Sequence, residues 1–383
     1  MTYIDLFVAF NRQNHHILLT KLADLGLPGW LLRIVVGFLT HREMVVRYKG
    51  EISGVKSLPG GGPQGTLLGL LLFLILINDL GFEGQVNNAG EIITCRKSLK
   101  AVNEIHLKYV DDLTYAESID LKDKLVSVPN NQRPLPDSYH ARTGHVLTSY
   151  TSKLSQQLVK TEEYAKENEM KFNHNKSKVM LFNPCSSLDF MPDVRLEGHQ
   201  LEVVDEIKLL GLVIRTDLKW ASNTEYMVKK AYSRLWTLRR LKSLGADEED
   251  LLDVYIKQVR SVLELAVPAW HGGLTQAERL DIERVQKSAL HIVLGSFYTS
   301  YNNALQVTNL ESLENRRDKL CLKFALKAEK HPKFREWFKK NEKNVNTRQK
   351  MPKYCEVKAR LERFKNSPIA YLTNKLNEHY KNK

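Results

Sequence analysis

Two adjacent aspartates interrupt an apolar, strand-like stretch of the sequence. Asp111 and Asp112 stand in KYVDDLTYAES, residues 108–118, where the flanking valine, leucine and tyrosine favour a sheet. An Asp-Asp pair in a hairpin is most often a turn, because Asp bonds readily to its own backbone. Burial supports another interpretation, since two like charges beside apolar neighbours repel each other and need a cation. A hard divalent metal ion with oxygen ligands meets that need.

A third aspartate stands in another apolar, strand-like stretch. Asp5 lies within YIDLFVAF, residues 3–10. Three carboxylates from separate segments suit two metal ions about 3.5 to 4 Å apart, which clamp the attacking and leaving oxygens of phosphoryl transfer. Taken alone, an aspartate in such a stretch is more often an ordinary residue of an edge strand than a metal ligand. The chemistry that the three residues suggest is metal-dependent phosphoryl transfer.

These carboxylates need a sheet, and the patterning up to about residue 220 supplies one. Residues 1–11 alternate weakly and predict a strand, and the following apolar segment predicts two helices broken at 26–29. Hairpins are predicted after residue 43 and around Asp111, with an apolar helix after Gly65 packed behind the sheet. The second half of this region predicts, in order, a helix over 151–168, a turn and strand over 170–183, and a strand pair over 207–220.

Beyond residue 222 the sequence becomes helical. Apolar residues recur at helical spacing from Met227 to Leu238, with basic residues between them. Gly245 is expected to end that helix, because glycine tolerates the left-handed conformation of a helix terminus. The remaining helix signals are Asp247 as a cap, a Thr275 and Glu278 capping box, and Gly295 as a stop.

The chain has 383 residues, 43% hydrophobic and 26% charged, which is ordinary for a globular protein of two or three modules. Its net charge of +13 is concentrated in residues 331–383, where 15 Lys and Arg face 5 acidic residues. The same segment mixes these charges with aromatic residues, among them Phe334, Trp337, Phe338, Tyr354, Phe364 and Tyr371. Cations and rings together suit phosphate contact and base stacking. A solvated set of amphipathic helices explains the charge equally well.

Neither a membrane segment nor an export signal is predicted. The longest apolar run, 67–77, contains a glycine and falls short of the roughly 18 residues that a membrane span needs. The N-terminal stretch has an acid and no basic leader, unlike a signal peptide. The four cysteines have no paired spacing, which fits scattered buried thiols in a reducing compartment: Cys95, Cys185, Cys321 and Cys355. We therefore expect an intracellular protein, nuclear or cytoplasmic.

Five ordered blocks resemble the palm of reverse transcriptases from non-LTR, LINE-type retrotransposons. They are YIDLFVAFN, GGGPQGTLLGLLLFLILINDL, KYVDDLTYAES, YAKENEMKFNHNKSKVMLF and IKLLGLVI. The later stretch AVPAWHGGLTQAERLDIERVQKSALHIVLG is similar to the thumb and downstream region of the same elements. A Tyr-x-Asp-Asp motif alone is unspecific, whereas five blocks in order at plausible spacing are specific.

The resemblance implies an α+β fold and an RNA-directed DNA polymerase. An antiparallel palm sheet backed by helices, with a primer-holding hairpin, would occupy residues 1–220. An all-helical thumb-like region over 221–330 and a basic helical tail over 331–383 would follow. The implied reaction transfers a deoxynucleotide to a primer 3′-hydroxyl with two Mg²⁺ ions. The implied partners are an RNA template, a DNA primer and deoxynucleoside triphosphates, with no membrane.

Residue roles follow from the same resemblance. The catalytic, metal-binding aspartates are matched by Asp5, Asp111 and Asp112. The nucleotide-contacting positions are matched by Phe10, Pro63, Gln64, Gly65 and Lys176, and the primer-holding hairpin by Leu210 and Gly211. From the residues alone, Phe10 also suits a core aromatic, the glycines a flexible turn, and Lys176 a solvated turn lysine.

The sequence also departs from the family pattern. The fingers blocks, which supply basic side chains for the triphosphate and the template, are missing ahead of Asp5. Asn11 stands where the family has an acid, and residues 119–148 align with nothing in it. We therefore expect an N-terminally truncated reverse transcriptase, with exposed apolar surface and poor solubility. The alternative is a catalytically inactive remnant that retains only nucleic-acid binding.

Overall fold

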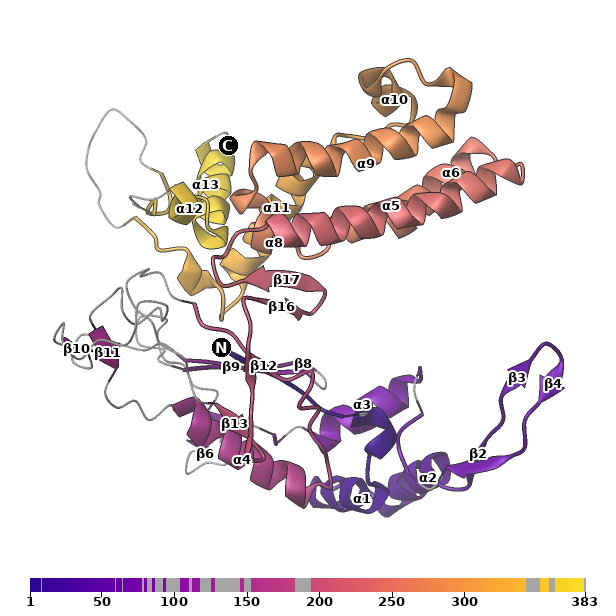
Figure 1. Ribbon diagram of the computed structural model, residues 1–383, viewed down its shortest axis with the longest axis vertical. Coiled ribbons are helices and arrows are strands. Elements are labelled where there is room, and N and C mark those ends of the chain that lie inside the picture. The colour runs from indigo at the N-terminus through magenta and orange to yellow at the C-terminus, as the bar shows by residue number, and fades with distance from the viewer. Residues whose placement is uncertain are drawn as a thin grey trace, which may run out of the picture. The chain divides into compact units, whose positions relative to one another are not determined.

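The chain divides into two compact units, Met1–Asp205 and Glu206–Lys383, here called the mixed unit and the helical unit (Figure 1). The computed structural model describes residues 1–7, 9–58, 60–63, 65–77, 79–80, 85–86, 92–93, 104–109, 112–117, 125–127, 145–147, 153–182, 194–341, 352–357 and 362–381. Helices and strands are both abundant, which confirms the α+β class. The expected domain bounds at residues 220 and 330 stay predictions.

A five-stranded sheet lies in the mixed unit, in the order β15-β12-β1-β9-β8. β1 (Thr2–Asp5) pairs antiparallel with β9 (Asp112–Glu117) on one side and β12 (Lys178–Val179) on the other. β8 (Glu104–Tyr109) pairs antiparallel with β9, and β15 (Glu202–Val203) pairs parallel with β12. The first strand of the chain is therefore internal to the sheet, with backbone partners on both sides.

The strand expected over residues 1–11 is shorter than the sequence suggested, because β1 ends at Asp5. A 3₁₀ helix, η1 (Ala9–Arg12), follows instead. Its backbone bonds to the glycine loop, where the Gly62 N–H donates to the Phe10 carbonyl over 2.7 Å. A carbonyl bonded in this way no longer needs a strand partner. This contact with the glycine loop therefore outweighs the weak apolar–polar alternation that predicted a longer strand.

The apolar helix predicted after Gly65 is α3 (Leu67–Leu76). One part of it packs behind the sheet, where Phe73 joins Ile4 and Leu113 in a buried cluster. Leu72 and Leu76 of the same helix pack in a second cluster. The partners in that cluster come from α1 (His15–Asp24) and α2 (Gly29–Leu39), the two helices predicted on either side of residues 26–29.

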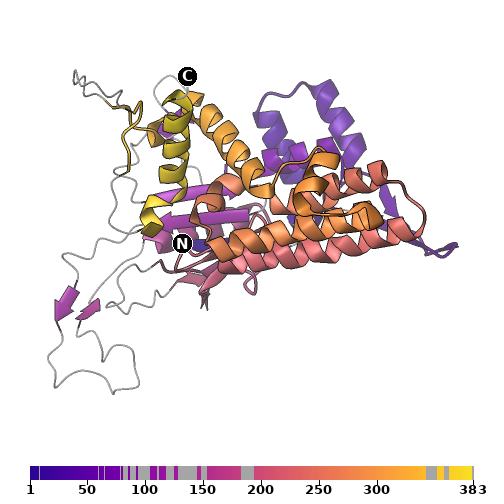
Figure 2. The ribbon, with the colours of Figure 1, turned by 90° about the horizontal axis from the view of Figure 1, so that it is seen from above.

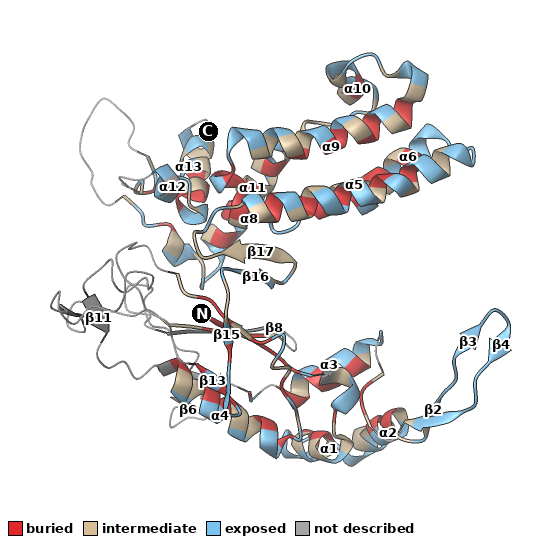
Figure 3. Ribbon diagram, viewed as in Figure 1, coloured by how far each residue is buried: buried red, intermediate tan, exposed pale blue. Residues whose placement is uncertain are grey.

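The other elements of the mixed unit are α4 and several short strands. α4 (Lys153–Glu167) confirms the helix expected over 151–168. The predicted hairpin after residue 43 forms β2 (Arg42–Met44) with β5 (Lys56–Leu58), and its outer part forms β3 (Arg47–Tyr48) with β4 (Glu51–Ile52). It extends away from the helices and is largely exposed (Figure 3). The remaining strands are β6 (Gln85–Val86), β7 (Ile92–Ile93), β10 (Leu125–Ser127), β11 (His145–Leu147), β13 (Arg195–Leu196) and β14 (His199–Gln200).

The helical unit begins with a hairpin and continues as helices. The hairpin is β16 (Glu206–Leu209) with β17 (Leu212–Arg215). The helices are α5 (Ala221–Ser243), α6 (Glu248–Val254), a π-helical turn η5 (Tyr255–Arg260), α7 (Ser261–Leu263), α8 (Val267–Trp270), η6 (His271–Gly273), α9 (Gln276–Leu294), η7 (Gly295–Phe297), α10 (Tyr301–Val307), α11 (Leu313–Lys330), η8 (Arg335–Trp337), α12 (Glu362–Lys365) and α13 (Pro368–Lys381). The long helices α5 and α9 lie side by side in both views (Figures 1 and 2).

The helix signals in the sequence are confirmed. Gly245 follows the end of α5 with a φ of +88°, and the Asp247 side chain accepts a bond from the Asp250 N–H over 2.8 Å. Thr275 and Glu278 form the reciprocal capping box at the start of α9. Gly295 caps the other end of α9 with a φ of +56°. No helix in the described part of the chain is long and apolar enough to cross a membrane.

Most aromatic residues of the basic tail belong to the core. Phe338 and Tyr354 are buried in the main cluster of the helical unit, which Phe334, Trp337 and Tyr371 also contact. Phe364 is 57% exposed. A buried ring has no free face for a nucleobase, so base stacking by Phe338 and Tyr354 is wrong. For the half-buried and exposed rings it stays a prediction. Of the cysteines, Cys321 is buried and Cys355 half-buried, while Cys95 and Cys185 lie outside the described residues.

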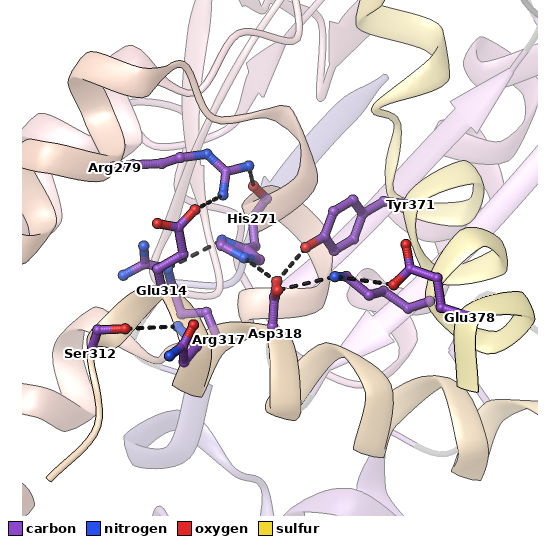
Figure 4. A network of polar contacts seen from close by, with 10 residues as sticks. His271, Arg279, Ser312, Glu314, Arg317, Asp318, Tyr371 and Glu378 are labelled. Atoms are coloured by element: carbon purple, nitrogen blue, oxygen red, sulfur yellow. Dashed lines mark hydrogen bonds and ion pairs between the residues drawn. The ribbon is translucent and has the colours of Figure 1, made fainter. Parts of the chain in front are cut away.

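A polar network joins η6, α11 and α13 through Asp318 (Figure 4). Asp318 accepts hydrogen bonds from His271 over 2.9 Å, from the Tyr371 hydroxyl, and from Lys375 over 3.0 Å. The buried Arg317 donates its Nε–H to Nδ1 of His271 over 3.2 Å. A ring that accepts at Nδ1 and donates at Nε2 is neutral, so the network requires the neutral form of this histidine.

Candidate active site

Two of the predicted aspartates face each other across neighbouring strands. Asp5, the last residue of β1, is the direct partner of Asp112, the first residue of β9. Directly opposed residues of an antiparallel pair project to the same face, with Cβ atoms about 4.5 to 5.5 Å apart. Asp111 is bonded to Asp112 in the sequence and lies outside the described residues. The sheet thus brings together two carboxylates that are 107 positions apart.

Among the described residues, each of the two carboxylates has a side-chain partner that stabilises its negative charge. The Tyr3 hydroxyl donates to Oδ1 of Asp112 over 2.5 Å. The Lys176 Nζ lies 3.5 Å from Oδ2 of Asp5. Asp5 is only 13% exposed at its side chain, whereas Lys176 is 68% exposed. With one lysine against two opposed carboxylates, the described part of this site keeps an excess of negative charge.

Local structure holds Lys176 next to Asp5. Residues 173–177 form a tight turn in which the Ser177 N–H bonds to the Asn173 carbonyl over 2.9 Å. The buried Ser177 hydroxyl accepts from the Asp5 N–H over 3.2 Å, and the Asn173 N–H donates to the Asp5 carbonyl over 2.8 Å. Asp5 is thereby bonded on both backbone groups by the turn that carries Lys176. A mobile surface lysine lacks this kind of anchorage.

Phe10 lies beside the glycine loop. Its half-buried ring stacks on Phe73 of α3, with centroids 4.2 Å apart and planes inclined by 26°. Gly61 has a φ of +77°, and a Cβ there would lie 2.7 Å from the Asn11 carbonyl oxygen. Only glycine fits such an approach. The loop is therefore packed against the backbone next to Phe10, which a freely flexible turn would not be.

The Pro63-Gln64-Gly65 block continues from that loop into α3. The Pro63 carbonyl accepts from the Thr66 hydroxyl over 2.9 Å, and the same hydroxyl caps α3 by accepting from the Gly69 N–H. Gly65 has a φ of +82°. Gln64 lies outside the described residues. The block thus sits at the N-terminus of α3, one loop away from Phe10.

Leu210 and Gly211 form the two-residue turn of the β16–β17 hairpin. Their φ values are +48° and +85°, as a tight two-residue hairpin turn requires. Leu210 is 49% exposed. The hairpin belongs to the helical unit, and a primer-holding role for its turn stays a prediction.

Residues 1–214 match the family model described as reverse transcriptase (RNA-dependent DNA polymerase). This is more than half of the chain and includes both aspartates, the glycine loop and the turn of the β16–β17 hairpin. The chain belongs to the reverse transcriptase family. The resemblance seen in the five sequence blocks is confirmed at this level.

Curated relatives of this chain come from mobile elements of flies. It is 22% identical over 338 residues to the probable RNA-directed DNA polymerase from transposon BS of Drosophila melanogaster, covering 86% of this chain and 33% of that protein. It is 23% identical over 251 residues to the RNA-directed DNA polymerase from mobile element jockey of Drosophila funebris, covering 64% of this chain and 23% of that protein. The chain therefore spans a third or less of the length of these relatives.

The reverse transcriptase site has the donor chemistry for a divalent metal ion. Carboxylate oxygens are the ligands that magnesium prefers, and Asp5 and Asp112 present such oxygens from opposed positions. The described residues contain no group of three His, Cys, Asp or Glu side chains placed to hold a metal. Asp111, the third expected ligand, lies outside them. The two described carboxylates fit a metal site without completing it.

Two residues of the site were not predicted from the sequence. Tyr3 stands two positions before Asp5, and residues two apart on a strand project to the same face. That alternation was a usable signal for the Tyr3 contact with Asp112. Ser177 gave no signal, because its role depends on where the turn after α4 meets the end of β1.

Proposed function

We propose that this chain is the RNA-directed DNA polymerase part of a non-LTR retrotransposon protein. It extends a primer by in-line attack of the 3′-hydroxyl on the α-phosphate of a deoxynucleoside triphosphate, with pyrophosphate leaving. The observation that carries the proposal is the pairing of Asp5 with Asp112 on neighbouring strands. The family match and the names of the curated relatives support the same reaction.

Asp5, Asp111 and Asp112 would hold two Mg²⁺ ions. When bound, these ions would lower the pKa of the primer hydroxyl and neutralise charge on the transferred and leaving groups. Tyr3 orients the Asp112 carboxylate by its hydrogen bond. Lys176 stands in the turn whose backbone is bonded to Asp5, while its ammonium is exposed. This ammonium supplies charge or a proton to the leaving pyrophosphate.

The nucleotide would lie over Phe10, with the Pro63–Gly65 block beside it. A flat ring at that position excludes a 2′-hydroxyl, which selects deoxynucleotides over ribonucleotides. The stack of Phe10 on Phe73 supports this role, because it fixes the ring in one orientation. These regions would correspond to a polymerase palm, with Leu210 and Gly211 holding the primer end and a thumb-like set of helices after residue 220.

The test is primer extension on an RNA template in the presence of Mg²⁺. The wild-type chain is compared with Asp5→Ala, Asp111→Ala and Asp112→Ala, and with Asp24→Asn as a control at an exposed acid on α1. We expect extension by the wild type and the control, and a loss of at least a hundredfold in each of the three variants. If the folded wild-type chain extends no primer, the catalytic proposal fails. The chain is then an inactive remnant with at most nucleic-acid binding.

A further inference from the structure

The outward face of α5 combines cations with an exposed tryptophan. Trp236 is 67% exposed and Tyr232 is 38% exposed, although both stand in the middle of a 23-residue helix. The opposite face carries buried Met227 and Leu235, which hold the helix on the core. An exposed indole in the middle of a well-packed helix has no role in that core and needs another explanation.

Helical spacing places Lys229, Trp236 and Arg240 in one stripe. The three residues are seven and four positions apart, so they lie on one face at intervals of about 10 and 6 Å. Arg239 flanks the stripe, and all three cations are exposed. Within the described residues, none of the three forms an ion pair with an acid. Other cations of the helix are engaged, since Lys242 bonds to the Val293 carbonyl over 2.6 Å and Arg234 bonds to the Gln258 carbonyl.

The charge around the stripe is one-sided. α5 contains six Lys and Arg and a single acid, Glu225, near its N-terminus. The acids in the first turn of α6, Glu248, Glu249 and Asp250, form no ion pair with the stripe in the described part of the chain. A protein partner would bury Trp236 among apolar neighbours, whereas its neighbours here are unpaired cations. Phosphates are the complementary charge.

We propose that the stripe of Lys229, Trp236 and Arg240, with Tyr232 and Arg239 at its margins, is a binding surface for single-stranded nucleic acid. The indole stacks on an unpaired base and the cations contact the flanking phosphates. A single strand is favoured over a duplex, because the bases of a duplex are already stacked and must be unstacked before they reach a side chain. The surface belongs to the helical unit and the carboxylate site to the mixed unit, and binding to the surface requires no catalysis.

The test measures binding of the full chain to a fluorescein-labelled 12-nucleotide oligo(U) and to a hairpin duplex of equal charge, by anisotropy at several salt concentrations. We expect preference for the single strand and quenching of tryptophan emission on binding. Trp236→Ala is expected to weaken binding about five- to hundredfold and to remove the quenching, while Trp236→Phe retains most of the affinity. Lys229→Gln and Arg240→Gln each reduce the slope of log affinity against log salt by about 0.7.

Trp30→Ala is the matched control, since Trp30 is 62% exposed on α2 of the mixed unit. It should leave binding and quenching unchanged, and far-UV circular dichroism should show that every variant is folded. The proposal is overturned if Trp236→Ala binds like the wild type or if the duplex binds equally well. It is also overturned if Trp236→Ala abolishes self-association of the chain but leaves oligonucleotide binding unchanged. Measuring Asp112→Asn in parallel separates this surface from catalysis, because that variant should bind the single strand normally whether or not the wild type extends primers.

Discussion

At the scale of single residues, the opposed carboxylates are the feature that stability alone does not explain. Like charges directly across an antiparallel pair destabilise a sheet, yet Asp5 and Asp112 occupy such positions. Their neighbours Tyr3 and Lys176 reduce the repulsion without removing it. A site selected for folding would place an asparagine or a threonine at one of the two positions. The retained charge is what a cation site requires.

Replacing one of these carboxylates should therefore separate stability from activity. Asp112→Asn keeps the shape of the side chain and an oxygen to accept from Tyr3, but it removes the repulsion with Asp5. In the presence of a chelator, we expect the free energy of unfolding to rise by about 0.2 to 1 kcal/mol, while primer extension is lost. Urea denaturation followed by circular dichroism measures the first effect.

Magnesium supplies the complementary measurement. Because a ligand that binds only the folded state stabilises it, Mg²⁺ should raise the melting temperature of the wild type and leave that of Asp112→Asn nearly unchanged. Asp24→Asn should respond like the wild type. Equal responses of all three proteins to Mg²⁺, or a large loss of stability in Asp112→Asn, would show that the pair serves the fold and holds no metal.

At the scale of elements, α3 has two apolar sides, of which one is buried in the core and the other is exposed. Phe73 and Leu76 are fully buried, whereas the opposite stripe is exposed, with Leu67 90% and Leu71 53% accessible. Leu70 and Leu74 extend this stripe at the same helical spacing. Exposed apolar stripes of this length mark interaction surfaces or aggregation hazards. The exposed leucines of α3 confirm the expectation that the chain has exposed apolar surface.

We predict that the chain associates with itself through the exposed side of α3. The double variant Leu67→Glu and Leu71→Lys should shift the sedimentation profile toward monomer, because charges on this face make its burial unfavourable. Leu72→Ala is the control, since that side chain faces the core. It should lower the free energy of unfolding by about 2 to 5 kcal/mol without favouring the monomer. A wild-type chain that is already monomeric at high concentration would contradict the prediction.

At the scale of the whole molecule, each unit has its own core, and the helical unit is linked by a titratable network. Burial lowers the pKa of His271 from its ordinary value of 6.5. The hydrogen bond to Asp318 raises this pKa and the nearby Arg317 and Arg279 lower it, so that the pKa remains below 6.5. Burial alone would raise the pKa of Asp318, but hydrogen bonds from His271, Tyr371 and Lys375 outweigh it. The pKa of that carboxyl therefore lies below its ordinary value of 3.8.

The stability of the helical unit should consequently fall with acid in two ranges. Below pH 6.5 the unfolded chain takes up a proton that folded His271 refuses, so the free energy of unfolding decreases, by at most about 1.4 kcal/mol per pH unit for this one proton. Below about pH 3.8 the unfolded chain also protonates Asp318 before the folded chain does, and a second loss begins.

Urea denaturation at a series of pH values, followed by helical circular dichroism, checks this behaviour. His271→Gln should be less stable than the wild type at pH 7.5 and should lose the dependence between pH 6.5 and 5. His331→Gln is a matched control, because that exposed ring lies outside the network. An unfolding free energy that stays constant from pH 7.5 to 5 in the wild type would refute the neutral buried form of His271.

Much of this chain was readable from local patterns. The capping box at Thr275 and the glycine stops at Gly245 and Gly295 depend on neighbours within four residues, so they needed no knowledge of the fold. The two helices on either side of residues 26–29 and the hairpin at Asp112 were likewise local. The order of the family blocks identified Asp5 and Lys176 as candidates, because their types and order are carried by the sequence itself.

Other features required the tertiary structure, because they depend on which distant segments meet. The register that sets Asp5 against Asp112 follows from the pairing of β1 with β9, and a shift by one residue would turn one of them to the other face. The turn after α4 places Lys176 beside Asp5. The tail showed the same limit in reverse. Its rings looked alike in the sequence, and only packing decided that Phe338 and Tyr354 belong to the core. Outside the tail, packing likewise decided that Trp236 on α5 is exposed.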